Sequence, residues 1–166
     1  MIYAGHQISF IPWIGYWKKI SDSDFFDLSI YEQFTKSTWI HYTYIGNNGK
    51  LVKWKLPVEK LWLINLILTE KIYNLIQLNT KLAILPNFDD KDDATTKIIK
   101  QAHALKCDQY LSGPHGINYL NLDKFKETNI EVKFQDTTYL YENYRQSIVS
   151  LISIYGLDYV LRLLKG

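Results

Sequence analysis

The sequence predicts an α/β fold, a single domain with a mostly parallel sheet, flanking helices and an added β-hairpin. Short apolar, β-branched or aromatic runs alternate along the chain with segments of helical periodicity. One Asn-Gly pair, Asn48-Gly49, lies between two such runs and marks a tight hairpin turn. The 166 residues are enough for one hydrophobic core and short for two, so we expect one domain over residues 1–166.

The beginning of the chain predicts a strand, a loop and a helix. An apolar run at residues 2–4 leads into the polar pair His6-Gln7, and an amphipathic segment follows Pro12. Proline is favoured at the first helical position because its fixed φ suits the helix and its missing N–H is not needed there. We therefore expect a helix over about residues 13–21 that is entered through Pro12.

The middle of the chain predicts the hairpin and a long helix. Residues 39–45 and 51–56 would be its strands, and alternation in the second places Lys53 on a solvent-facing side. Residues 58–78 predict a helix with an apolar face of period three to four. The residues expected on that face are Leu61, Ile64, Leu68, Ile72, Leu75 and Leu78.

The second half predicts three further strands and three helices. We expect helices at 94–105, 122–127 and 157–165, the last beginning after a break at Gly156. The acidic run at 89–93 suits the first of these helices because carboxylates are favoured near a helix N-terminus. The five parallel strands should contain, in chain order, Ile2, Phe25, Leu82, Gln109 and Val132.

Composition excludes several classes of protein. A net charge of +2 is too close to neutral to indicate nucleic-acid binding. The single cysteine, Cys107, excludes an internal disulfide and a cysteine-based zinc cluster. No signal peptide opens the sequence, and the longest apolar run, 61–68, is interrupted by Asn65, so we expect a cytoplasmic protein that does not cross a membrane. The 13 Tyr, 7 Phe and 5 Trp suit either a tyrosine-rich core or stacking on a flat ligand.

Two histidines are the best indication of a site. His6 and His115 each follow a predicted strand, so in a parallel sheet both should emerge at the same edge, where ligands bind. No Gly-rich nucleotide motif, nucleophile elbow or histidine pair with metal spacing is present, so we expect no cofactor and no metal. Catalytic residues stay unassigned, with His6 and His115 the only candidates, and His103 within a predicted helix is not expected in the site. The segment from Ser112 to Gly116 fits a functional loop and a plain turn equally well.

His6-Gln7, the segment IPWIGY at 11–16 and Lys19 form an ordered block that resembles the opening signature of the WbqC-like family. Members of that family are linked to surface-polysaccharide and modified-sugar gene sets, with a suspected role in transferring an acyl or amino-acid group. The resemblance implies a pocket for a small phosphorylated or sugar-like ligand. The ligand-binding residues that we expect in it are His6, Gln7, Trp13, Gln33, Lys36, Trp39, Ser112, Gly113, His115 and Tyr119.

The chain also departs from the family pattern. Ile30 and Tyr31 replace acidic residues, and Tyr42 and Tyr44 lie where the family has an Asn/Arg-rich stretch. Carboxylates and arginines are the groups that move protons and stabilise charge in a reaction. Their loss predicts a shortened, divergent member that holds a nucleotide or sugar nucleotide without converting it, with aromatic replacements adding stacking area.

Two alternatives remain open. The protein could be a transferase that moves an acyl or aminoacyl group onto an activated sugar or nucleotide, using His6 and His115. It could instead be a protein-interaction module, compatible with a homodimer, whose hairpin exposes a contiguous aromatic patch. That patch would consist of Trp39, Tyr42, Tyr44 and Trp54.

Overall fold

The computed structural model describes residues 1–31, 40–47, 50–55, 61–86, 88, 91–140 and 146–165. Within them lies a five-stranded parallel sheet of order β5-β2-β1-β6-β7. Its strands are β1 (Ile2–Gln7), β2 (Phe25–Ser29), β5 (Lys81–Ala83), β6 (Gln109–Ser112) and β7 (Glu131–Phe134). The predicted α/β class is confirmed, and each of the five strands contains the residue expected in it.

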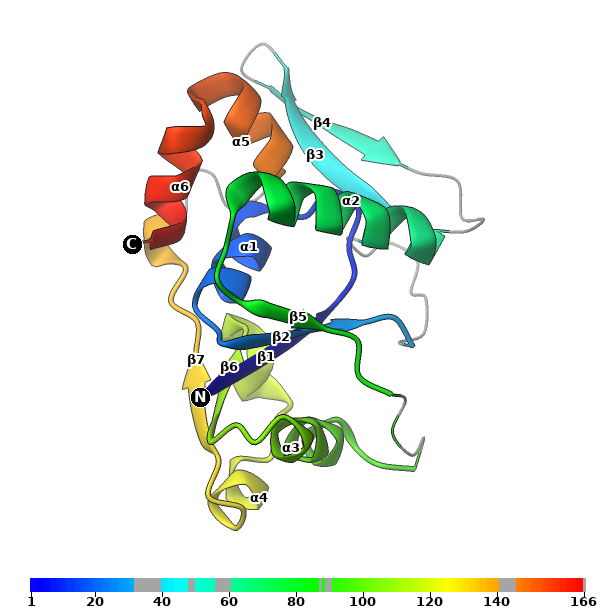
Figure 1. The fold of residues 1–166 in the computed structure, drawn as a ribbon, viewed down its shortest axis with the longest axis vertical. Coiled ribbons are helices and arrows are strands. Elements are labelled where there is room, and N and C mark those ends of the chain that lie inside the picture. The colour runs from blue at the N-terminus through cyan, green and yellow to red at the C-terminus, as the bar shows by residue number, and fades with distance from the viewer. Residues whose placement is uncertain are drawn as a thin grey trace.

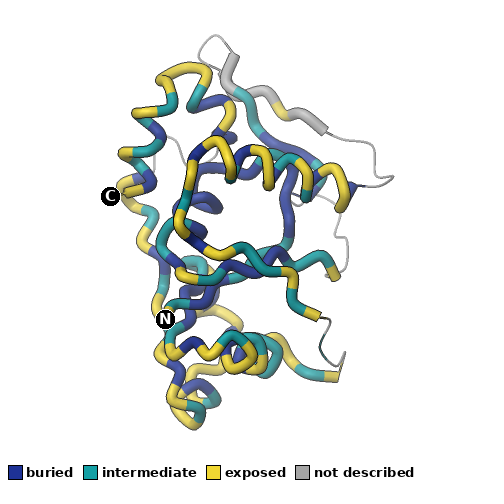
Figure 2. Tube along the Cα trace, viewed as in Figure 1, coloured by how far each residue is buried: buried dark blue, intermediate teal, exposed yellow. Residues whose placement is uncertain are grey.

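Helices cover both faces of the sheet (Figure 1). One face carries α1 (Ile14–Ser21), α2 (Leu61–Ile76), α5 (Ile148–Tyr155) and α6 (Leu157–Lys165), and the other carries α3 (Ala94–Ala104) and α4 (Leu122–Lys126). Each face of the sheet has its own hydrophobic core, and β1 contributes to both because successive side chains of a strand point to opposite faces. Tyr3 belongs to the core on the α3 side with Phe125, and Ala4 belongs to the core on the α1 side with Trp17. Figure 2 shows the buried central strands running between the more exposed outer helices.

The strand order creates a switch point between β1 and β6. From β1 the chain proceeds outward through β2 to β5, and then α3 carries it back to β6 and β7 on the other side of β1. Because the connections leave two neighbouring strands in opposite directions, a crevice opens beyond their carboxyl ends. This is the place in a doubly wound sheet where a ligand is expected.

The entry into α1 differs from the prediction. Pro12 is not the first helical residue: Trp13 is the N-cap in an extended conformation, and the helix begins at Ile14. The reason is a β-bridge between Trp13 and Ser147, which keeps Trp13 extended. Ile11 has φ 42°, rare for a β-branched residue, and its carbonyl accepts a hydrogen bond of 2.9 Å from the Thr43 hydroxyl.

The hairpin is confirmed as a pair of antiparallel strands, β3 (Tyr42–Asn47) and β4 (Lys50–Lys55). Its turn residues, Asn48 and Gly49, lie outside the described residues. Lys53 is exposed as predicted, with its ammonium 3.7 Å from the ring centroid of Tyr42.

The prediction of an exposed aromatic patch on the hairpin is wrong for Tyr42. Tyr42 is only 8% exposed, because β3 packs against the beginning of α5, where Ser147 N–H donates to the Tyr44 carbonyl. Trp39 and the side chain of Trp54 lie outside the described residues.

Helix α2 is rotated from its expected orientation. Ile64 and Leu75, expected in the buried stripe, are exposed, whereas Asn65 and Thr69 are fully buried. The Asn65 amide donates a 2.7 Å hydrogen bond to the carbonyl of Ile40, which fixes this face inward. The outward face is consequently apolar, with Trp62, Leu63, Ile64, Ile67 and Leu75 exposed.

No helix within the described ranges is both long enough and apolar enough to cross a membrane.

Candidate functional site

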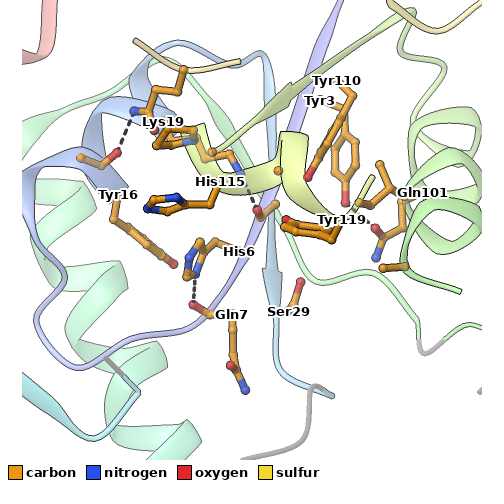
Figure 3. A pocket seen from close by; sticks show the side chains of 18 of the residues that line it. Tyr3, His6, Gln7, Tyr16, Lys19, Ser29, Gln101, Tyr110, His115 and Tyr119 are labelled. Atoms are coloured by element: carbon orange, nitrogen blue, oxygen red, sulfur yellow. Dashed lines mark hydrogen bonds between the residues drawn. The ribbon is translucent and has the colours of Figure 1, made fainter. Parts of the chain in front are cut away.

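A cavity of about 410 Å³ lies at the carboxyl ends of β1 and β6, at the switch point of the sheet (Figure 3). Its walls come from the end of β1, from α1, from α3 and from the 3₁₀ helix η1 (Pro114–Asn118) that follows β6. Ser29, the last residue of β2, and Gln135, which follows β7, also line the cavity. The volume suits a small molecule.

The structure brings many of the predicted site residues together. His6 and His115 line the same cavity, as the parallel sheet predicts, and four further predicted residues join them: Gln7, Trp13, Gly113 and Tyr119. Whether these residues bind a ligand stays a prediction. Gln33, Lys36 and Trp39 lie outside the described residues.

Ser112 does not line this cavity. It is the last residue of β6 and is fully buried, so its expected contact with ligand stays a prediction that this cavity does not support. Its hydroxyl donates to the Gly113 carbonyl at 3.1 Å. A Cβ placed on Gly116 would lie 1.9 Å from the Ser112 Oγ, so η1 packs directly onto this serine. Ser112 therefore supports the loop that carries His115.

The residues that replace the family's charged positions do not line this cavity either. Ile30, Tyr31, Tyr42 and Tyr44 are all described, and none of them is among its lining residues. The aromatic walls come from other elements: Trp13 at the N-cap of α1, Tyr16 in its first turn, and tyrosines from β1, from β6 and from the residue after η1. These strand and loop tyrosines are Tyr3, Tyr110 and Tyr119.

His6 is held with a defined tautomer at the end of β1. Its Nδ1 lies 2.8 Å from the Gln7 carbonyl oxygen, which can only accept, so Nδ1 carries the proton and Nε2 of the neutral ring is an acceptor. The ring packs edge-on against Trp13 and Tyr16, at centroid distances of 5.5 and 5.2 Å. Burial, assisted by the positive charge of Lys19, lowers the pKa of His6 to about 4, so the ring is neutral at pH 7.

Lys19 is one of the lining residues that sequence reasoning missed, together with Tyr16 and Tyr110. It lies in α1, is 5% exposed and lines the cavity, and its ammonium donates to the Gly5 carbonyl at 2.9 Å. Burial lowers the pKa of Lys19 to about 8. Its neighbour Lys18 pairs with Asp22, but no carboxylate of the described residues forms an ion pair with Lys19.

Asp27, the buried carboxylate that the described residues place near this end of the sheet, forms no ion pair with Lys19. Asp27 in β2 accepts hydrogen bonds from the Leu85 N–H at 2.9 Å and from the Ser29 hydroxyl at 2.7 Å. These bonds tie the carboxylate to β2 and to the segment after β5. The cavity therefore has a buried positive charge whose neutralising anion is absent from the described protein groups.

The α3 wall adds polar groups opposite α1. The Tyr3 hydroxyl donates to the Gln101 side-chain oxygen at 2.6 Å, and its ring lies 5.6 Å from that of Tyr110. Ala94 and Lys97, in the first turn of α3, also line the cavity, and the carboxylate of the N-cap residue Asp93 accepts from the Thr96 N–H at this end of the helix. Among the described residues, no group of three or more His, Cys, Asp or Glu side chains is placed to hold a metal ion.

The order of the sheet and the place of the cavity define a doubly wound α/β protein with a small-molecule-sized cavity at its switch point. The model of the WbqC-like protein family matches the chain in two segments, residues 7–61 and 55–161. The chain belongs to the WbqC-like protein family. No curated protein and no solved structure matches it.

Proposed function

We propose that the protein binds a small anionic molecule of the nucleotide, sugar-nucleotide or sugar-phosphate type in this cavity and releases it unaltered. The observation that carries the proposal is Lys19, a buried ammonium that lines the cavity without a carboxylate partner among the described residues. A buried charge is costly unless it is paired. A bound phosphate would supply the missing anion.

The remaining lining supports a ligand that combines charge with a ring. Trp13, Tyr16 and Tyr110 present aromatic surface, which contributes stacking and apolar contact to sugars and bases. Lys97 in the first turn of α3 adds a second positive charge to the lining, which favours the same anion as Lys19. Charge and rings thus meet within one cavity of suitable size.

The transferase alternative is favoured by His6, whose Nε2 is available to accept a proton from a reacting group. The pKa of about 4 makes this nitrogen a weak base at neutral pH, because effective bases have a pKa near the working pH. Lys19 and His6 therefore support retention of an anion better than proton transfer.

Titration with UMP, UDP-glucose and glucose 1-phosphate, followed by tryptophan fluorescence and calorimetry, tests the proposal. We expect saturable one-to-one binding of at least one of these probes and a loss of about tenfold or more in affinity for His6→Ala, about 1.4 kcal/mol. His103→Ala is the matched control, because His103 is exposed on the far side of α3 from the lining residues. Equal losses in both variants would place the binding site elsewhere.

The same preparation separates binding from turnover. After incubation with cell extract and heat denaturation, we expect mass spectrometry to recover one unmodified molecule per protein. Accumulation of a covalently changed product over many turnovers would instead establish the transferase.

A second candidate, self-association, is favoured by the apolar outward face of α2, because closed twofold dimers are the commonest assemblies. Trp62 is 52% exposed and Leu75 53% exposed on this face. We expect light scattering to show a dimer that Trp62→Glu converts to a monomer, whereas Lys71→Glu, on the same helix, leaves it dimeric. The measurement is made at about 100 µM protein, so that even a weak dimer would be populated. If the native protein is a monomer at this concentration, the candidate is rejected.

A further inference from the structure

Tyr16 carries a hydroxyl that the fold does not use. The residue is 2% exposed, and its hydroxyl oxygen has no hydrogen-bond partner in the described part of the chain. Its ring packs edge-on against Trp17 and Phe26, at centroid distances of 5.9 and 5.4 Å. A phenylalanine would make the same ring contacts without burying an unpaired hydroxyl, which is unfavourable. Packing therefore accounts for the ring of Tyr16 and not for its hydroxyl.

The second unused group lies beside it. Figure 3 shows the hydroxyl end of Tyr16 next to the imidazole of His6, and the two ring centroids are 5.2 Å apart. Nδ1 of His6 is engaged with the Gln7 carbonyl, which leaves Nε2 as the acceptor of a neutral ring. One corner of the cavity thus offers a donor, the Tyr16 O–H, and an acceptor, the His6 Nε2.

We propose that Tyr16 and His6 together bind a hydroxyl of the ligand, so that the ligand is a phosphorylated sugar-type ring bearing free hydroxyls. The ligand hydroxyl donates to the His6 Nε2 and accepts from the Tyr16 O–H. A phosphate or carbonyl oxygen satisfies only Tyr16, because it has no proton for Nε2. An amide N–H satisfies only His6.

The surrounding charges place the anion elsewhere. Burial is the main cause of the raised pKa of Tyr16, and the nearby negative charge of Asp27 adds to it. The same charge disfavours a phosphate in this corner. Lys19 is near enough to His6 to help lower its pKa, so the anion site adjoins the hydroxyl site. This inference rests on the proposed function, because it requires an anionic ligand held by Lys19.

Three probes separate the two corners: inorganic phosphate, cyclohexyl phosphate and α-glucose 1-phosphate. The last two share a six-membered ring with phosphate on a ring carbon, and only the sugar has ring hydroxyls. We expect the native protein to bind glucose 1-phosphate about tenfold more tightly than cyclohexyl phosphate. In Tyr16→Phe this ratio should fall to below about threefold, while the affinities for cyclohexyl phosphate and inorganic phosphate stay unchanged.

Thermal melting supplies the control for folding. Tyr16→Phe should melt at or above the native temperature, because its hydroxyl has no partner to lose. Tyr3→Phe, the matched variant, should melt lower, because its hydroxyl donates to Gln101.

The outcomes are distinguishable. If the native protein binds cyclohexyl phosphate and glucose 1-phosphate equally, or if Tyr16→Phe keeps the native ratio, the hydroxyl site is wrong and the anion site stands. If the native protein binds none of the three probes, the anion site itself fails, and the hydroxyl site with it.

Discussion

Replacing Lys19 with methionine is expected to stabilise the free protein at pH 7 and to weaken phosphate binding about a hundredfold, about 2.7 kcal/mol. Methionine fills similar space without a charge. The pKa of Lys19 is about 8 in the fold, against an ordinary value of 10.5, which corresponds to a destabilisation of about 3 kcal/mol while the ammonium is buried. Loss of the hydrogen bond to the Gly5 carbonyl offsets about 1 kcal/mol of the gain.

The pH dependence follows from the lowered pKa. Below pH 8 Lys19 is protonated in both the folded and the unfolded chain, so the full destabilisation is present. Between pH 8 and 10.5 the folded protein releases the proton and the unfolded chain keeps it, so the native protein gains stability relative to Lys19→Met as the pH rises. Phosphate affinity should change in the opposite sense and fall as the pH rises through about 8.

Urea unfolding at about pH 7, 8, 9 and 10 measures the change in stability, and calorimetry at the same pH values measures the phosphate affinity. Lys71→Met is the control, because it removes the same charge from an exposed position on α2. A Lys19→Met protein that is less stable at pH 7 and binds phosphate normally would show that Lys19 is a structural residue.

The position of the cavity could be predicted from the sequence, but its charge could not. His6 and His115 were found because parallel strands end at one edge, whatever the details of packing. Lys19 was missed because the Lys18-Lys19 pair reads as an ordinary basic last turn of a helix. The two lysines differ only in how α1 packs, with every residue from Ile14 to Ile20 buried. Lys18 pairs with Asp22, whereas Lys19 reaches the cavity and the Gly5 carbonyl.

Two further differences from what the sequence predicts depend on tertiary structure. Ser112 was expected at the site through the resemblance to the family, but it is the last residue of β6 and its side chain lies beneath η1. In α2 the apolar residues are spread around the helix, so periodicity alone does not select the buried side. The buried side is selected by the hydrogen bond from the Asn65 amide to the Ile40 carbonyl, a contact that forms only in the tertiary structure.

Substituting Gly116 with alanine is expected to destabilise the protein by about 2 kcal/mol and to weaken ligand binding as η1 shifts with His115. The new Cβ would lie 1.9 Å from the Ser112 Oγ, closer than Cβ atoms come in proteins, and 3.1 Å from a methyl carbon of Leu120, a tight contact. Gly113, in the same loop, is the control, because a Cβ there has nothing within 4 Å, so Gly113→Ala should change stability little.

A double-mutant cycle identifies the clash with Ser112 as the cause. Ser112→Ala removes the Oγ that the new Cβ would strike, at the loss of one hydrogen bond to the Gly113 carbonyl. Ser112→Ala combined with Gly116→Ala should therefore be more stable than Gly116→Ala alone, by about 1 kcal/mol in urea unfolding, and should regain ligand affinity. Additive losses would mean that the two side chains do not clash with each other. The loss in Gly116→Ala would then come from the contact with Leu120.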